Sequence, residues 1–180
     1  MPIDYVYLDP TAYVNPPVLE AIENADAIVF CPGDLYTSVI PNLLVQDVSE
    51  TIRSSSASKI HVCNLMTRPG ESDGFKASDF VKTLIDYLGG RHIDHLVVNS
   101  APFPKGLVKR YQGLDQHPVE LDADECRSLT LNLVETPLVG EGVYLRHDPH
   151  ALAAILVAIA SKNPGSAKTL LQQRAEADGN

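Results

Sequence analysis

The residues best placed to do chemistry form the segment Cys31–Ser38, which reads Cys-Pro-Gly-Asp-Leu-Tyr-Thr-Ser and directly follows an apolar run. Gly33 would let the backbone approach an anion, because glycine carries no Cβ. The following N–H groups and the hydroxyls of Thr37 and Ser38 could donate to phosphate oxygens, helped by a helix dipole. The pattern favours a phosphate site, and it equally fits a strand-to-helix turn that Thr37 or Ser38 merely caps.

Asp34 is the residue of this segment that argues against phosphate, because its carboxylate would repel such a ligand. The segment also lacks the Gly-Lys-Ser or Gly-Lys-Thr sequence that ends a Walker loop. These observations leave the phosphate site and the plain turn as open alternatives.

A second polar segment, Asn64–Gly74, follows another apolar run. Its Arg68 could pair with a phosphate or a carboxylate. Glu71 and Asp73 could hold a divalent ion together with phosphate oxygens, since Mg²⁺ prefers a few carboxylates plus substrate oxygens. The alternative interpretation is a solvated turn built from Glu71, Ser72 and Asp73.

The stretch His147–His150 reads His-Asp-Pro-His and suggests a metal or acid–base pair. An N-cap is the favoured interpretation, with Asp148 capping a helix and Pro149 at its first position. The other histidines show no metal-ligand spacing.

Alternating strands and helices must position these segments. Short apolar runs predict strands at residues 3–8, 26–30, 59–65 and 93–98. Helical spacing predicts helices at residues 16–24 (capped by Asn15), 38–44, 47–54 and 78–88 (capped by Ser78 and ended by Gly89-Gly90). This alternation predicts an α/β fold with a mostly parallel sheet.

Ligands of open parallel sheets bind at the carboxyl ends of the strands. We therefore expect the segments 31–42, 64–74 and 99–106 to meet at that edge. Beyond Pro102 the pattern loosens, and it predicts short strands at 119–121 and 128–134 and helices at 150–161 and 164–177. We expect one domain over residues 1–180, with a terminal helix and tail from 162 onward.

Composition excludes several classes of partner. The formal charge of −9 and the lack of a basic stripe argue against nucleic acid. No apolar run approaches the ~20 residues of a membrane span, and we expect no signal peptide, because Asp4 and Asp9 interrupt the first residues. The three cysteines are odd in number and form no Cys-x-x-Cys pair, which is typical of reduced thiols in a cytoplasmic protein.

Two long motifs carry a family resemblance. Residues 32–44 resemble the segment Gly-Pro-Gly-Ser-Leu-Tyr-Thr-Ser-Ile-Ile-Pro-Asn-Leu-Leu of YvcK-like gluconeogenesis factors, which are relatives of the 2-phospho-L-lactate transferase CofD. Residues 63–74 resemble that family's Cys-Asn-Leu-Met-Thr-Gln-Pro-Gly-Glu-Thr-Asp-Gly segment, and Arg146–Pro149 matches a motif near its C-terminus. The likeness runs from about Ile3 to about Ile159.

The resemblance implies a Rossmann-like fold with helices on both faces of the sheet, a cytoplasmic location and a site for a UDP-sugar or a dinucleotide. No catalytic or metal-binding residue is assigned. The implied ligand contacts are Gly33, Leu35, Tyr36, Thr37, Ser38, Asn42, Asn64, Thr67, Arg68, Gly70 and Glu71.

Three functions stay open under this resemblance. The first is a YvcK-like regulator of carbon metabolism and cell shape that binds a phosphorylated nucleotide-type ligand. The second is a magnesium-dependent CofD-type transferase that moves a phospholactyl group to a deazaflavin; Mg²⁺ is the one cofactor considered. The third is an interaction module without a ligand, a possible homo-oligomer that pairs through an exposed sheet edge.

The sequence departs from the family pattern in two ways. It has no Gly-Gly-Gly-Thr-Gly loop, so we expect it to correspond to the C-terminal part of the family fold, without the N-terminal glycine-rich half. Cys31 stands at the family's first glycine, Asp34 at its serine and Arg68 at its glutamine. Arg68 could offset the negative charge of Asp34.

Overall fold

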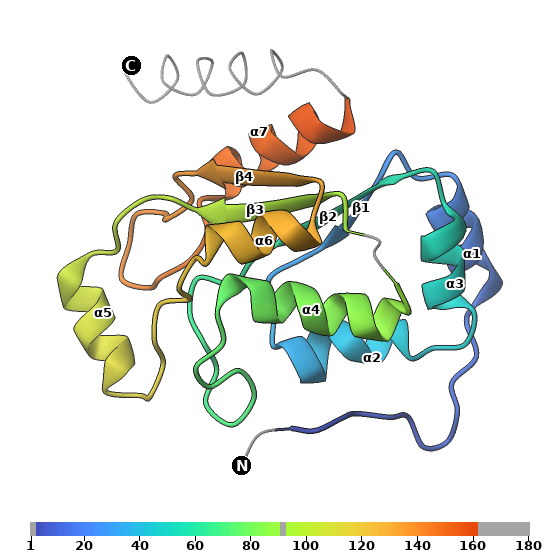
Figure 1. Ribbon diagram of the computed structural model, residues 1–180, viewed down its shortest axis with the longest axis horizontal. Coiled ribbons are helices and arrows are strands. Elements are labelled where there is room, and N and C mark those ends of the chain that lie inside the picture. Colours follow the sequence, from blue (N-terminus) through green and yellow to red (C-terminus); the bar gives the residue numbers. More distant parts are fainter. Residues whose placement is uncertain (1–2, 91–92, 162–180) are drawn as a thin grey trace.

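The computed structural model (Figure 1) describes residues 3–90 and 93–161. Its elements follow in the order α1 (Pro16–Glu23), β1 (Ala27–Phe30), η1 (Leu35–Val39), α2 (Ile40–Leu43), α3 (Val48–Ser54), β2 (Ser58–Val62), α4 (Ala77–Leu88), β3 (His95–Asn99), α5 (Lys105–Gln112), α6 (Ala123–Leu129), β4 (Asn132–Thr136) and α7 (Pro149–Ala160).

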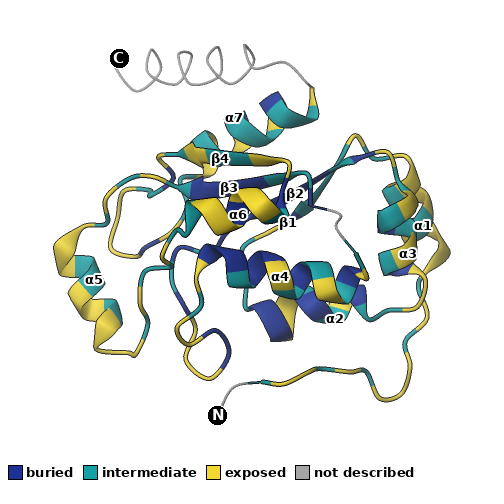
Figure 2. Ribbon diagram, viewed as in Figure 1, coloured by how far each residue is buried: buried dark blue, intermediate teal, exposed yellow. Residues whose placement is uncertain are grey.

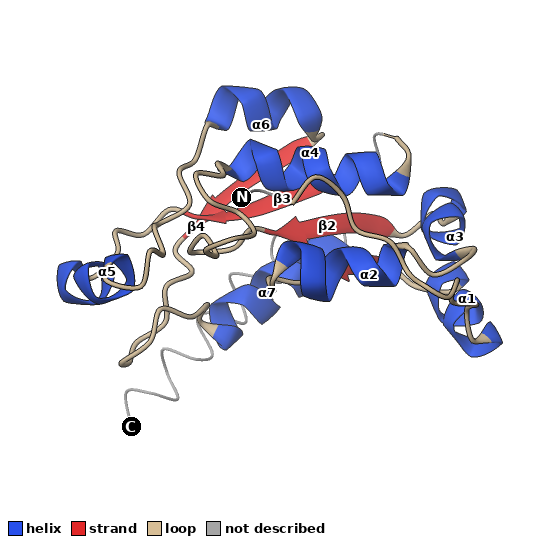
Figure 3. Cartoon of the chain, turned by 90° about the horizontal axis from the view of Figure 1, so that it is seen from below, coloured by secondary structure: helices blue, strands red, loops and turns tan. Residues whose placement is uncertain are grey.

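The four strands form one parallel sheet whose spatial order, β1-β2-β3-β4, equals the chain order. Helices cover both faces, with α4 and α6 on one side and α7 on the other (Figure 3). The predicted Rossmann-like α/β fold is therefore confirmed. Since every strand points the same way, all strand-to-helix loops leave from one edge of the sheet.

The core consists of two apolar clusters, one on each face of the sheet. Figure 2 shows the buried positions of β3 and α4 among its ribbons. Alternation along the strands divides the two clusters: Ile60 and Val62 face the α7 side, whereas Leu96 and Val98 pack with Phe80 of α4. Each fully buried side chain of this size stabilises the fold by about 1.5–3 kcal/mol. The sheet is consequently a rigid base for the loops at its edge.

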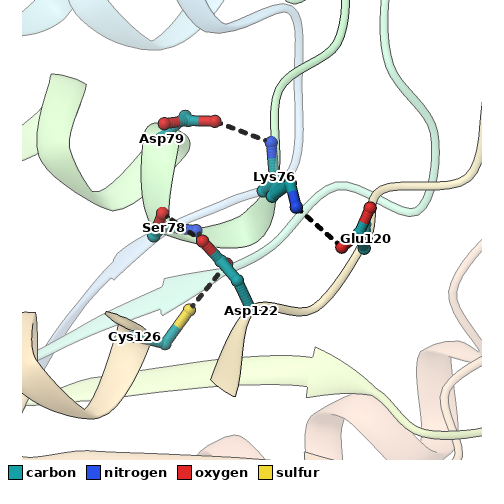
Figure 4. A network of polar contacts seen from close by, with 6 residues as sticks. All are labelled: Lys76, Ser78, Asp79, Glu120, Asp122 and Cys126. Atoms are coloured by element: carbon teal, nitrogen blue, oxygen red, sulfur yellow. Dashed lines mark hydrogen bonds and ion pairs between the residues drawn. The ribbon is translucent and has the colours of Figure 1, made fainter. Parts of the chain in front are cut away.

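The start of α4 differs from the prediction. The helix begins at Ala77, and Lys76 rather than Ser78 takes the N-cap position, where its N–H donates to Asp79 Oδ2 at 2.8 Å. Ser78 lies inside the first turn, and its N–H and hydroxyl donate to Asp122 at 3.0 and 2.5 Å (Figure 4). Sequence alone could not show this because Asp122 lies 44 residues further on. The predicted stop is confirmed, with Gly89 in the left-handed region at φ 74°.

The predicted strand at residues 3–8 is wrong. This segment is irregular and lies outside the sheet, and the N–H of Val6 donates to the hydroxyl of Tyr87 at 2.9 Å. Ile3 and Val6 pack against the core, while Tyr5 and Tyr7 are exposed. The apolar run that suggested a strand therefore reflects one-sided packing without a strand neighbour.

The region after β3 was also predicted incorrectly. Residues 119–121 form no strand, because Glu120 makes only an isolated bridge to Lys76. The predicted strand 128–134 divides between the end of α6 and the start of β4, and α5 was not predicted at all. The proposed helix 164–177 lies outside the described residues.

The helices nearest the two ends of the described chain, α1 and α7, agree better with the prediction. α1 begins after Asn15 as predicted, with proline in its first turn, although the Asn15 side chain makes no capping bond. α7 is confirmed, and Asp148 Oδ1 accepts from the N–H groups of His150 and Ala151 at 2.9 and 3.1 Å. The capping interpretation of Asp148 is thus confirmed. None of the described helices is long and apolar enough to cross a membrane.

Candidate functional site

The loops that follow β1 and β2 meet at the carboxyl edge of the sheet. The Asn64 side-chain amide donates to the carbonyl of Gly33 at 2.8 Å, and the Thr37 hydroxyl donates to Glu71 Oε1 at 2.8 Å. Asn99, at the end of β3, lines a small hollow together with Asn64. The predicted convergence of the three loops is confirmed.

The first loop continues into η1, a π-helical turn whose residues point in different directions. Leu35 and Tyr36 are buried in the apolar core, whereas Thr37 and Ser38 are exposed. The Asn42 side chain donates to the carbonyl of Ser38 at 2.7 Å. Among these predicted contacts, Ser38 presents a hydroxyl at the surface, whereas the hydroxyl of the exposed Thr37 is bonded to Glu71.

The turn at Gly33 does not itself demand glycine. A Cβ at this position would lie 3.6 Å from Ser38 Cβ, an ordinary van der Waals distance. Glycine therefore leaves the backbone open at the edge of the sheet without being required by the fold.

Glu71 is the most unusual side chain of the second loop. It is only 8% exposed, and while Oε1 accepts from Thr37, Oε2 is buried with no hydrogen-bond partner. An unpaired buried polar atom costs about 1–3 kcal/mol, and a charged one costs more. Such an atom in a loop at the sheet edge points to a missing donor.

Hydrogen bonds link the residues of the loop around Glu71. The N–H of Arg68 donates to Ser72 Oγ at 2.8 Å, and the N–H of Gly70 donates to Asp73 Oδ2 at 2.7 Å. Gly70 has φ +78°, a conformation that favours glycine. Gly70 and Asp73 thus build the turn, which leaves Glu71 as the buried carboxylate facing Thr37.

Thr67 is buried and joins the loop to the segment that contains His117. It is 4% exposed; its N–H donates to the carbonyl of His117 at 2.7 Å, and its hydroxyl accepts from the N–H of His117 at 2.9 Å. The same strand-like segment continues to Glu120, whose carbonyl accepts from Ala77 and whose carboxylate binds Lys76 at 2.8 Å (Figure 4). Segment 117–122 therefore holds both ends of the Glu71 loop.

A hollow of about 310 Å³ lies where the loops that follow β1 and β2 begin. It is lined by Pro32, Asn64, Leu65, Met66, Tyr111, Leu145, Arg146 and His147. Of these, Tyr111 was not predicted from the sequence, Arg146 was recognised only as part of a motif, and His147 was considered only within that motif and as part of a metal or acid–base pair. The Arg146–Pro149 motif could have indicated these last two residues, because it places the cation of Arg146 two residues before Asp148, the N-cap of α7.

His147 is half-buried, and its Nε2 donates to the carbonyl of Cys63 at 3.1 Å. Burial lowers the pKa of His147, while the bond to Cys63 acts in the opposite direction. The ring is therefore neutral at pH 7, with its proton on Nε2. His147 ties the segment before α7 to the end of β2.

Two arginines lie near this hollow around one aromatic ring. The guanidinium carbons of Arg110 and Arg146 lie 5.4 and 5.5 Å from the centre of the Tyr144 ring, within the range of cation–π attraction. In residues 3–90 and 93–161, neither guanidinium forms an ion pair with a carboxylate. This edge therefore concentrates positive charge on a chain whose formal charge is −9.

Another hollow, of about 600 Å³, lies between α1 and α3 and is lined by Glu23, Asp47 and Glu50 with hydroxyl residues. It shares no lining residue with the loops of the carboxyl edge. We do not assign the candidate site to it.

The donor set for magnesium is incomplete. Across the part of the chain that the structure describes, no three His, Cys, Asp or Glu side chains gather in a way that could hold a metal ion. Asp73 is engaged by Gly70, so Glu71 is the one carboxylate of this pair that faces the site. These residues do not fit a magnesium site on their own.

Comparison with known proteins places this geometry in context. The family model described as 2-phospho-L-lactate transferase CofD matches residues 1–139. The gluconeogenesis factor of Bacillus subtilis is 36% identical over 143 residues, which cover 79% of this chain and 45% of that protein. The putative gluconeogenesis factor of Thermotoga maritima is 42% identical over 159 residues, covering 86% and 50%.

A crystal structure of a Bacillus halodurans protein superimposes with a TM-score of 0.83 at 34% identity. The alignment covers 87% of this chain and 51% of that one. The chain thus spans about half the length of the relatives it matches.

Proposed function

This chain belongs to the CofD family, and on that premise we propose that it binds a phosphorylated nucleotide-type ligand, such as a UDP-sugar or a dinucleotide. Its relatives carry the name gluconeogenesis factor. In this proposal the bound ligand makes the protein a YvcK-like regulator of carbon metabolism and cell shape.

The observation that carries the proposal is the Thr37–Glu71 junction. Glu71 Oε2 is a buried acceptor without a donor, next to a hydroxyl that already satisfies Oε1. A carboxylate oxygen suits the hydroxyl groups of a sugar or ribose, which are neutral donors. Filling that position would remove the cost of an unpaired buried atom.

The phosphate part of the ligand needs donors and positive charge. Ser38 supplies an exposed hydroxyl, and the open backbone at Gly33 allows close approach. The Thr37 hydroxyl is already donated to Glu71. Arg146 adds a guanidinium from the neighbouring hollow, and arginine binds phosphate through two parallel N–H bonds. A chain with net negative charge can bind an anion only where such groups converge.

The test is thermal unfolding by fluorimetry with UDP-glucose, NAD and GDP at millimolar concentration. A ligand at 100 times its Kd stabilises the folded state by about 2.7 kcal/mol, which corresponds to a Tm increase of several degrees for a chain of about this size. Glu71→Gln should abolish the shift, because it replaces the acceptor by an amide donor. Glu50→Gln, at the α1–α3 hollow, is the matched control and should keep it.

No Tm shift of the wild-type chain with any of the three ligands would refute the proposal. A shift that survives Glu71→Gln unchanged would refute the assigned site.

One observation favours a second candidate, the interaction module. β1 is an edge strand of the described sheet and has no neighbour on its outer side, and Val157 of α7 is 49% exposed. Unpaired edges of apolar strands invite pairing with another chain. Sizing chromatography separates this candidate from the first, since a strict monomer that binds ligand would weaken it.

A further inference from the structure

We propose that the Asp34 carboxylate competes with the ligand's phosphate for the Arg68 guanidinium, and that this pair sets how strongly the site depends on ligand charge. The inference rests on the proposed function, because it concerns the same ligand at the same edge of the sheet. Its subject is the ion pair in which Arg68 Nε lies 3.7 Å from Asp34 Oδ1.

The contact between the two side chains is loose. A separation of 3.7 Å is beyond the range of a good N–H···O hydrogen bond, and the two side chains are 53% and 42% exposed. Within residues 3–90 and 93–161, the guanidinium of Arg68 has no other carboxylate partner. Its two terminal nitrogens are therefore open to a ligand.

The backbone groups of Asp34 and Arg68, in contrast, are held by hydrogen bonds. The carbonyl of Asp34 accepts from the N–H of Ser38 at 2.8 Å at the start of η1. Arg68 donates its N–H to Ser72 Oγ, and its carbonyl accepts from the N–H of Glu71 at 3.1 Å. Only side-chain rotation is needed to separate the pair, so neither loop has to rearrange.

The position of the pair ties it to the ligand site. Asp34 precedes Thr37 by three residues and Arg68 precedes Glu71 by three, so the ion pair and the Thr37–Glu71 hydrogen bond link the same two loops in the same order. A phosphate beside Thr37 would meet a cation and an anion together. Asp34 would repel it, and it would also hold part of the charge that Arg68 offers.

Exposed ion pairs are weak, whereas a phosphate can bind arginine through two charge-assisted bonds. The ligand should therefore displace Asp34, at a cost in affinity. Removing the Asp34 charge should tighten binding by about threefold to fivefold, the factor that corresponds to the strength of an exposed ion pair. The gain should be confined to ligands that carry phosphate.

The experiment is a double-mutant cycle with the wild-type chain, Asp34→Asn, Arg68→Gln and the double variant. The Kd values for GDP, UDP-glucose and NAD are measured by titration calorimetry at low and at high salt. We expect Asp34→Asn to tighten binding when Arg68 is present and to have little effect in the Arg68→Gln background. The tightening should shrink at high salt, because both interactions are screened.

The Lys82–Glu125 pair is a matched control. Its atoms lie 2.8 Å apart between α4 and α6, and its side chains are 45% and 48% exposed. Glu125→Gln should leave every Kd unchanged, which excludes a general effect of net charge.

Two results would overturn the inference alone. Weaker binding by Asp34→Asn would mean that Asp34 holds Arg68 in place for the ligand. Equal tightening in both backgrounds would mean that Asp34 only repels the phosphate directly. If none of the four proteins binds any of the three ligands, the proposed function fails, and this inference fails with it.

Discussion

The hydroxyl of Thr37 donates to Glu71 Oε1 across 2.8 Å, and this bond joins the loops that leave two adjacent parallel strands. It satisfies one oxygen of a carboxylate that is almost fully buried, and it leaves the other without a partner. The same contact therefore supports the fold and lies beside the buried, unpaired acceptor on which the proposed function depends.

Thr37→Val should show how much the bond between Thr37 and Glu71 contributes to the stability of the fold. The substitution keeps the shape of the side chain but leaves Glu71 with both oxygens unpaired, so the free energy of unfolding should fall by about 1–3 kcal/mol. Urea denaturation measures the change. Thr51→Val is the control, because the Thr51 hydroxyl bonds only a backbone carbonyl on the exposed surface of α3; its effect should stay below about 0.5 kcal/mol. Equal losses in both variants would contradict a special role for the Thr37–Glu71 bond.

Arg146→Gln should weaken binding of a phosphorylated ligand. The guanidinium lines the hollow and makes no ion pair with a carboxylate among the described residues. Losing a charge-assisted contact to phosphate costs about 1.5–3 kcal/mol, or tenfold and more in Kd. Titration calorimetry with GDP checks this, with Arg127→Gln as the control, since Arg127 already pairs with Glu135 at 3.0 Å. An unchanged Kd for Arg146→Gln would remove Arg146 from the site.

Asp122→Ala should destabilise the protein through the start of α4. Asp122 accepts from the N–H and the hydroxyl of Ser78 and from the thiol of Cys126 (Figure 4). Burial acts to raise the pKa of Asp122, but the bonds from Ser78 outweigh it, and the pKa is lowered. We expect a loss of about 2 kcal/mol in urea denaturation. Asp124→Ala, at a fully exposed neighbour, should cost less than about 0.5 kcal/mol.

Acid should destabilise the chain through His61. Burial lowers the pKa of this histidine from 6.5 to about 4, and its bond to the carbonyl of Phe30 opposes that shift only partly. Above pH 6.5 the ring is neutral in both states. Below pH 6.5 only the unfolded chain takes up the proton, so the free energy of unfolding falls down to about pH 4, by about 3 kcal/mol in total.

Urea denaturation between pH 7.5 and 4.5 checks the His61 prediction. His61→Leu should remove most of the slope, and a smaller part should remain because His95 and His147 also have lowered pKa values. The comparison uses the slope with pH rather than the absolute stability, which the substitution changes by itself. An identical slope in the variant would assign the acid sensitivity to other groups.

The local sequence determined the parts of the fold that depend on short-range patterns. Short, largely apolar runs predicted β1, β2 and β3, because strands buried on both faces of a parallel sheet are mostly apolar. The helical spacing of Phe80, Val81 and Leu84 predicted α4, and Asp148 with Pro149 predicted the start of α7. The parallel topology then located the site, since it brings the loops after consecutive strands to one edge.

Tertiary structure alone decided which residues within that edge face a ligand. Leu35 and Tyr36 belong to the motif but turn into the core, and Thr67 is engaged by His117, which lies 50 residues further along the chain. Residues 3–8 form a short apolar run like those of the strands but have no strand neighbour. Propensity is a property of a segment, whereas pairing and side-chain direction depend on what packs against it.

The contacts that define the site link segments that are distant in the sequence. The pair Asp34–Arg68 and the hollow lined by Tyr111 and Arg146 exist only because loops from different strands are held side by side. The sequence by itself determined the residue types available at this edge. Their distances, burial and partners, which decide the chemistry, follow from packing over the whole sheet.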